Sequence, residues 1–215
     1  MILDLHSHSD ASEDSRAPVE TYLKWLTRKR DVLPIDGIVL TEHRQWNPTA
    51  DYRRLEDQYG VLILRGAEVE TDYGHMLIYG VTDDMTRRFD FANVRLPAQE
   101  VVTGVQQLGG IAVPCHPGRP NVGLFAHYDA RGPVPGVRIV ETLNGGSRAG
   151  ENERSRAQAE RHGYRGIGGS DAHIVSHVGR CATRFDDPIR SEGDLVAALR
   201  AGRFEAIAWP STSRG

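Results

Sequence analysis

Short apolar runs alternate with amphipathic stretches along almost the whole chain, and this alternation constrains the fold more than any other feature. Apolar runs of strand length occupy residues 2–5, 37–40, 61–64, 76–79, 111–113, 137–140 and 166–168. Helical spacing of apolar residues predicts helices at 19–26, 97–108 and 194–199, while 149–162 predicts an exposed helix with a weak apolar face. Strands that alternate with helices are typical of β/α units around a largely parallel sheet, so we expect an α/β fold.

The chain of 215 residues is long enough for one domain with a continuous core and short for two. Its segments rich in glycine and proline, at 117–120, 132–136 and 145–150, follow predicted strands and are typical of loops rather than of interdomain linkers. We therefore predict a single domain that covers residues 1–215.

The balance of charge limits the partners that the protein can bind. A formal net charge of -3 at pH 7 argues against an extended nucleic-acid surface. A small anionic substrate is still possible, because bound cations would make the site locally positive. The N-terminus lacks the basic segment, apolar stretch and cleavage site of a secretory signal, so we expect a cytoplasmic protein that does not enter a membrane. Cys115 and Cys181 are expected to be reduced packing residues.

Most of the nine histidines lie at the C-terminal ends of predicted strands, together with Asp and Glu. In a β/α barrel this edge carries the active site, because the loops there converge on the barrel mouth. His6 and His8 are two residues apart in a strand, so their side chains point to the same face and can bind one cation. Asp171 and His173 repeat this spacing, and His43 follows another apolar run.

Carboxylates at the same strand ends complete a set of metal ligands. Glu68 is a candidate for a ligand that bridges two cations, because a carboxylate has two oxygens; Glu70 has the same strand parity and is a rival. Repeated imidazole and carboxylate groups at successive strand ends are difficult to explain without metal. Such mixed nitrogen and oxygen sites accept Mn, Fe and Zn, so the sequence predicts two or three divalent metal ions.

Five motifs, taken in order, resemble those of one known family, the PHP (polymerase and histidinol phosphatase) superfamily. The resemblance spans nearly the whole chain and rests on His6-Ser7-His8, Thr41-Glu42-His43, Gly66-Ala67-Glu68, His116-Pro117 and Ser170-Asp171-Ala172-His173. It implies a distorted seven-stranded β/α (TIM-like) barrel that holds three divalent cations. Glu42 stands where the family usually has Asp, which leaves the part it plays open.

The resemblance also implies which residues bind each cation. Three groups follow: His6, His8, Glu68 and Asp171 for the first cation; Glu68, His75 and His116 for the second; and Asp14, His43 and His173 for the third. Glu13 is adjacent to Asp14 and is an alternative ligand.

The function that follows is hydrolysis of a phosphate mono- or diester by a metal-activated water. The expected substrate is a small phosphorylated molecule, for which a nucleotide or an oligonucleotide end is a candidate. Arg119 and Arg180 lie in loops after metal motifs, where a guanidinium can clamp phosphate, and His177 is a candidate proton donor to the leaving group.

Two other functions remain open at this point. An amidohydrolase-type barrel that cuts a C–N bond also opens with His-x-His, but it typically needs a metal-bridging lysine, and no lysine follows the third or fourth predicted strand. A non-catalytic, metal-stabilised module is the second alternative, and loss of ligands would be its sign.

Overall fold

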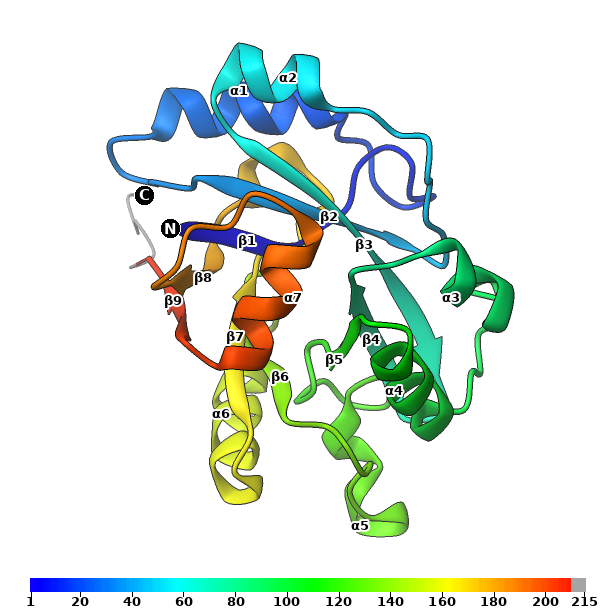
Figure 1. The fold of residues 1–215 in the computed structure, drawn as a ribbon. Helices are drawn as coiled ribbons and strands as arrows, with labels where there is room; N and C mark the ends of the chain where they lie inside the picture. The colour runs from blue at the N-terminus through cyan, green and yellow to red at the C-terminus, as the bar shows by residue number, and fades with distance from the viewer. Residues whose placement is uncertain (210–215) are drawn as a thin grey trace.

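The computed structural model describes residues 1–209 and contains a curled sheet of seven strands, with a second sheet of two strands beside it (Figure 1). The order of the large sheet is β5-β4-β3-β2-β1-β8-β9. Its strands are β1 (Ile2–Ser7), β2 (Gly37–His43), β3 (Leu62–Thr71), β4 (Gly74–Tyr79), β5 (Ile111–Pro114), β8 (Cys181–Phe185) and β9 (Phe204–Ala208). The small sheet pairs β6 (Ile139–Asn144) with β7 (Arg165–Gly169) in parallel.

The small sheet lies across the open side of the large one, because β6 contacts β5 and β7 contacts β1. Two backbone hydrogen bonds join the end of β7 to β1: Asp171 N donates to His6 O at 2.7 Å, and His8 N donates to Ala172 O at 2.9 Å. The curled sheet is thus a half-barrel surrounded by helices. The α/β fold expected from the sequence, a distorted TIM-like barrel, is confirmed.

The expectation of a largely parallel sheet is wrong for half of the large sheet. β1, β2 and β3 are parallel, but β4 is antiparallel to both β3 and β5, and β8 is antiparallel to β1 and β9. Only Asp72 and Tyr73 separate β3 from β4, and a parallel connection needs a crossover of a dozen or more residues. A hairpin is the result. Gly74 begins β4 with φ of 99°, and a Cβ there would lie 2.2 Å from Val122 O.

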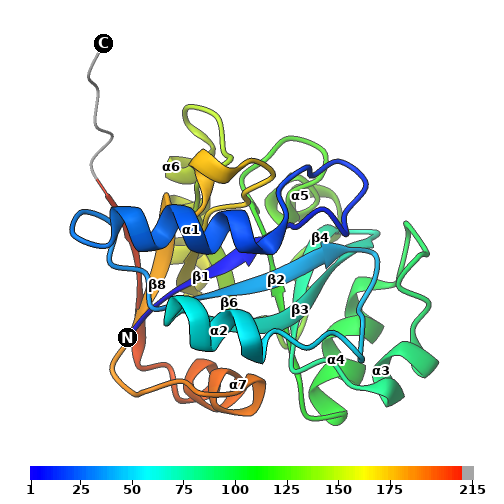
Figure 2. The ribbon, with the colours of Figure 1, turned by 90° about the horizontal axis from the view of Figure 1, so that it is seen from above.

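The four predicted helices are present as α1 (Val19–Lys29), α4 (Ala98–Gln107), α6 (Glu151–His162) and α7 (Glu192–Ala201). α6 buries only Ser155 and Ala159, as expected for an exposed helix. Three short helices and two 3-10 turns were not predicted: α2 (Arg53–Tyr59), α3 (Asp83–Arg88), α5 (Tyr128–Arg131), η1 (Leu124–Ala126) and η2 (Val175–His177). From above, α1 and α2 lie side by side along β1 and β2 (Figure 2).

The core forms on both faces of the sheet, because successive strand residues point to opposite sides. In β2, Ile38 packs with Leu23 of α1, while its neighbour Val39 packs with Leu5 and Leu64. Cys115 and Cys181 are both buried and free, as expected. No helix within residues 1–209 has the length and apolar character needed to cross a bilayer.

Candidate metal centre

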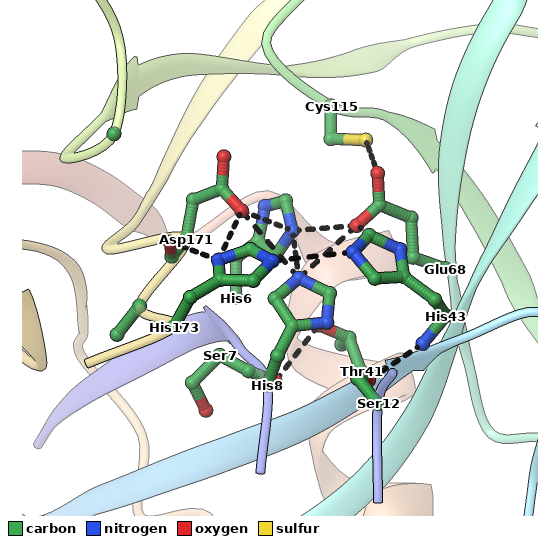
Figure 3. A network of polar contacts seen from close by, with 12 residues as sticks. His6, Ser7, His8, Ser12, Thr41, His43, Glu68, Cys115, Asp171 and His173 are labelled. Carbon is green, nitrogen blue, oxygen red and sulfur yellow. Dashed lines mark hydrogen bonds and ion pairs between the residues drawn. The ribbon is translucent and has the colours of Figure 1, made fainter. Parts of the chain in front are cut away.

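Residues from six strands or their ends meet in one cluster at one edge of the barrel. Figure 3 shows the part of the cluster formed by His6, His8, His43, Glu68, Asp171 and His173. β1, β2, β5 and β7 bring their histidines and Asp171 there at or just beyond their C-terminal ends. Two placements differ from the predicted strand ends. Glu68 lies inside β3, which continues to Thr71, and His75 lies near the start of β4. Because β4 is antiparallel to β3, its first residues reach the same edge.

The first group joins His6, His8, Glu68 and Asp171, all buried. Glu68 Oε2 lies 2.9 Å from His6 Nε2 and 3.1 Å from His8 Nε2, and Asp171 Oδ1 lies 3.4 Å from each of these nitrogens. His6 Nε2 and His8 Nε2 are themselves 3.0 Å apart. Ligand atoms held about 2.0–2.2 Å from one cation are separated by roughly 2.9–3.5 Å, so these four atoms are spaced as metal ligands are.

The second group uses the other oxygen of Glu68. Oε1 lies 2.8 Å from His75 Nδ1 and 3.2 Å from His116 Nε2. One buried carboxylate therefore faces two sets of imidazoles, as expected for a bridging ligand. Its rival Glu70 is partly exposed and lies 3.8 Å from Arg44 Nη1, outside these groups.

A third group joins His8, His43 and His173. His43 Nε2 and His173 Nε2 are 3.2 Å apart, and Asp14 Oδ2 lies 3.4 Å and 3.3 Å from them. The neighbouring Glu13 instead forms an ion pair with Arg44 and is largely exposed. Of the two acidic residues, the structure therefore brings Asp14 and not Glu13 to the cluster.

Glu42 holds the turn that carries Asp14. Its carboxylate accepts hydrogen bonds from Ser9 N at 3.0 Å and Ser9 Oγ at 2.6 Å, and from Ser12 Oγ. Ser12 Oγ in turn accepts from His43 N at 3.1 Å. Glu42, whose side chain is one methylene longer than the Asp usual in the resembling family, thus links the turn to β2. The sequence had left the role of Glu42 open.

The charges in the cluster suit cation binding. Burial alone would raise the pKa of Glu68, but His6, His116 and His75 outweigh it and hold that pKa well below its usual range. Asp171 behaves in the same way, with His6 and His8 as the main opposing groups. Burial lowers the pKa of His43 to about 4, which keeps its imidazole neutral and its lone pair free.

Two further observations show that the residues fit divalent cations. His8 Nδ1 and His116 Nδ1 are buried and have no hydrogen-bond partner within residues 1–209. Close nitrogen pairs such as His6 Nε2 and His8 Nε2 are unfavourable unless a proton or a cation lies between them. Nitrogen and carboxylate donors in this mixture suit Mn, Fe and Zn. Divalent metal binding is therefore supported, while the number and identity of the ions stay predictions.

Glu141, which the sequence analysis did not select, supports the cluster from behind. It is fully buried at the centre of β6. Oε1 accepts from His6 Nδ1 at 3.0 Å, while Oε2 accepts from His116 N and Asn144 Nδ2, both at 2.8 Å. A carboxylate behind a ligating histidine fixes the ring and its tautomer. The signal was an acidic residue in an apolar segment, but the predicted strand stopped at Val140.

Arg119 contacts the cluster directly. Its Nη2 donates to Asp171 Oδ2 at 2.6 Å and to Asn144 Oδ1 at 3.1 Å. Arg119 and His177 line a hollow of about 640 Å³ beside the cluster, which Asp171 and His173 also reach. Burial and the nearby Arg180 lower the pKa of His177. Arg180 is exposed and does not line this hollow. The substrate-binding roles of Arg119 and Arg180, and the proton-donor role of His177, stay predictions.

Two of the candidate ligands adopt left-handed backbone conformations, which side chains other than glycine rarely do. His116 has φ of 32° and Asp171 has φ of 52°. Each lies two residues beyond the end of a strand, and both backbone N–H groups are satisfied there, by Glu141 Oε2 and His6 O respectively. Strained residues concentrate where function fixes the geometry, so this pattern agrees with a working site.

A family model described as PHP-associated matches residues 149–204 of the chain. No curated protein matches the sequence.

Solved structures show the same fold over nearly the whole chain. PsfC from Pseudomonas syringae PB-5123 has a TM-score of 0.70 and 20% identity, covering 99% of this chain and 92% of its own. A protein from Bifidobacterium adolescentis, named as a metal-dependent phosphoesterase, has a TM-score of 0.57 and 16% identity. The match covers 93% of this chain and 96% of that protein. An amidohydrolase from Chromobacterium violaceum with bound sulfate has a TM-score of 0.60 and 18% identity, and the match covers 99% of each chain.

Proposed function

We propose that the chain is a member of the PHP superfamily and a metal-dependent phosphoesterase, which hydrolyses a phosphate mono- or diester at a site for three divalent cations. The similar proteins support a hydrolase in the broad sense, since one is named as a phosphoesterase and another as an amidohydrolase. The phosphoester bond is the more specific step of the proposal.

The observation that carries the proposal is the position of Glu68 between two sets of histidines. Oε2 faces His6 and His8, and Oε1 faces His75 and His116. One buried carboxylate can in this way hold two cations side by side. Asp14, His43 and His173 would hold the third cation at the exposed end of the cluster.

Cations bound there would lower the pKa of a water molecule and neutralise charge on the phosphoryl oxygens. The chain supplies the rest. Glu141 holds His6, Glu42 holds the turn with Asp14, and Arg119 holds Asp171. The hollow beside Arg119 and His177 has the size of a small-molecule site. A small phosphorylated substrate fits it, and a nucleotide or oligonucleotide end is included in that class.

The amidohydrolase alternative draws on the similarity to the Chromobacterium violaceum protein. The chain has two lysines, Lys24 and Lys29, and both lie on α1. Lys24 pairs with Glu20 at the surface. Neither lies on a strand that carries the ligand groups, so the lysine bridge of that chemistry has no counterpart here. A non-catalytic module is disfavoured as well, because the expected ligands converge.

The experiment is a substrate panel with the protein freed of metal and then loaded with Mn, Fe or Zn. The panel contains p-nitrophenyl phosphate, bis-p-nitrophenyl phosphate, sugar phosphates, nucleotides, a short oligonucleotide and N-acyl amino acids. We expect turnover of phosphoesters that chelation abolishes and that Glu68→Gln lowers together with metal content. Turnover of the N-acyl compounds alone would establish amide hydrolysis instead, and inactivity on the whole panel with full metal loading would favour the non-catalytic module.

A further inference from the structure

A second hollow, of about 360 Å³, lies at the end of the barrel opposite the candidate metal centre. Its wall includes Ile111 at the start of β5, Ile139 at the start of β6 and Arg165 at the start of β7, together with the last residues of α7. The metal cluster lies at the other ends of these strands. Ile111, which lines the hollow, and His116 of the cluster are five residues apart along β5 and its end, which corresponds to at most about 17 Å.

The charge of this wall differs from that of the whole protein. Arg138, Arg165 and Arg200 line the hollow, and no Asp or Glu does. The chain as a whole has 29 acidic residues against 26 Lys and Arg. In the part of the chain that the structure describes, none of these three arginines forms an ion pair with Asp or Glu. The arginines that do so lie elsewhere.

Two of the three guanidinium groups are held in place by backbone carbonyls. Arg200 Nη2 donates to Gly110 O at 3.0 Å, and Arg165 Nη1 donates to Gly202 O just after α7. Each group keeps further N–H donors, because a guanidinium has five. Capping of these carbonyls is the simplest role for Arg165 and Arg200, but it does not account for Arg138, whose side chain is exposed on the same wall.

The inner part of the same hollow is apolar. Val102, Ile139 and Leu199 line it, and all three are buried. A cavity with apolar walls and a few converging polar groups is typical of small-molecule sites. Cations at one side and apolar side chains at the other match a ligand that has an oxyanion and an apolar group, since arginine binds carboxylates, phosphates and sulfonates through charge-assisted hydrogen bonds.

We infer that this hollow is a second binding site, separate from the metal centre, for a small amphipathic oxyanion. The anionic group lies against Arg138, Arg165 and Arg200, and the apolar group lies against Val102, Ile139 and Leu199. The inference does not depend on the reaction at the metal centre. It concerns a ligand that is bound and not hydrolysed.

Calorimetric titration with naphthalene-1-sulfonate tests the inference, because this probe has an apolar ring and an oxyanion but no ester to hydrolyse. We expect one probe per chain, and the same affinity with Mn present or with EDTA. Arg138→Glu should weaken binding about 10- to 100-fold, the range for a lost charge-assisted bond, while Arg138→Lys should retain most of it. Arg190→Glu is the matched control, an exposed arginine that precedes α7 at its other end, and should bind like the unchanged protein.

Several results would overturn the inference. Equal affinity of Arg138→Glu and the unchanged protein would show that the probe binds elsewhere. Loss of binding in EDTA would place the probe at the metal centre. Equal binding of 1-naphthylmethylamine, which has the same ring and a positive charge, would remove the role of the arginines, and absence of binding by the sulfonate would remove the site.

Discussion

Arg119 and Asp171 form a partly buried pair in which one carboxylate serves two purposes. Oδ2 of Asp171 accepts from Arg119 Nη2 at 2.6 Å, while Oδ1 faces His6 Nε2 and His8 Nε2 at 3.4 Å. Arg119 therefore fixes the orientation of a candidate metal ligand. Arg119 also lines the neighbouring hollow, which is the proposed substrate site.

The first prediction separates these two roles of Arg119. If the arginine only bound substrate, Arg119→Ala would leave metal content unchanged. The contact with Asp171 predicts that metal affinity also falls, by about 10-fold, which is the lower end for loss of a group that orients a ligand. Metal analysis after dialysis and kcat/KM on a phosphoester measure the two effects. Arg119→Lys should recover part of both, because it keeps the charge but loses the planar fork.

The second prediction concerns Glu141. Its two oxygens accept from His6 Nδ1, His116 N and Asn144 Nδ2. Glu141→Gln must turn its NH₂ group toward one of these donors, although the side chain keeps its size. We expect metal affinity to fall about 10- to 100-fold. Titration with Mn measures it, and Glu205→Gln, an exposed change on β9, is the control. Unchanged affinity would mean that His6 does not need this partner.

The third prediction decides between Asp14 and Glu13. Asp14 Oδ2 lies within 3.4 Å of His43 and His173, whereas Glu13 pairs with Arg44. Asp14→Asn should therefore remove one cation per chain and leave the buried ones bound, and Glu13→Gln should leave the metal content as it was. Glu42→Ala should resemble Asp14→Asn, because the turn then loses its anchor. Elemental analysis counts the ions, and a full complement in Asp14→Asn would exclude this ligand.

The sequence predicted the candidate site better than it predicted the sheet. Spacing of two residues in a strand puts His6 and His8 on one face whatever the neighbouring strands do, and the structure agrees. The direction of β4 depends on the length of the β3–β4 connection, and the predicted end of β3 at residue 64 hid the hairpin. β8 and β9 were missed because short strands with mixed polar residues give a weak periodic signal.

Glu141 shows why the supporting residues were harder to find. A ligand is recognised by its motif, whereas a residue that orients a ligand needs only to lie behind it in space. Glu141 is 135 residues from His6 along the chain, and no local spacing relates the two. Glu42 was noticed because it stands within a motif, but its contacts with Ser9 and Ser12 needed the folded turn.

The last prediction concerns pH and the removal of metal. In the metal-free protein, burial lowers the pKa of His6, but Glu141, Asp171 and Glu68 outweigh it and hold that pKa well above its usual value. The pKa of His8 is raised too, since hydrogen bonds to Asp171 and Glu68 outweigh burial. Protons on these rings therefore stabilise the metal-free fold below about pH 6.5, and this stabilisation is lost as the pH rises through the raised pKa values.

Cations have the opposite dependence on pH, because a ligating imidazole must give up its proton. The gain in stability on adding Mn should thus be small near pH 6 and should grow toward pH 8.5. It reaches about 4 kcal/mol where the free ion is 1,000 times the dissociation constant. Thermal unfolding with Mn or with EDTA, across this range, measures the difference in Tm. His127→Gln, a change at the partly exposed ring near Asn121, is the control and should keep the trend. An equal gain at both ends of the range would show that no cation displaces a proton from His6 or His8.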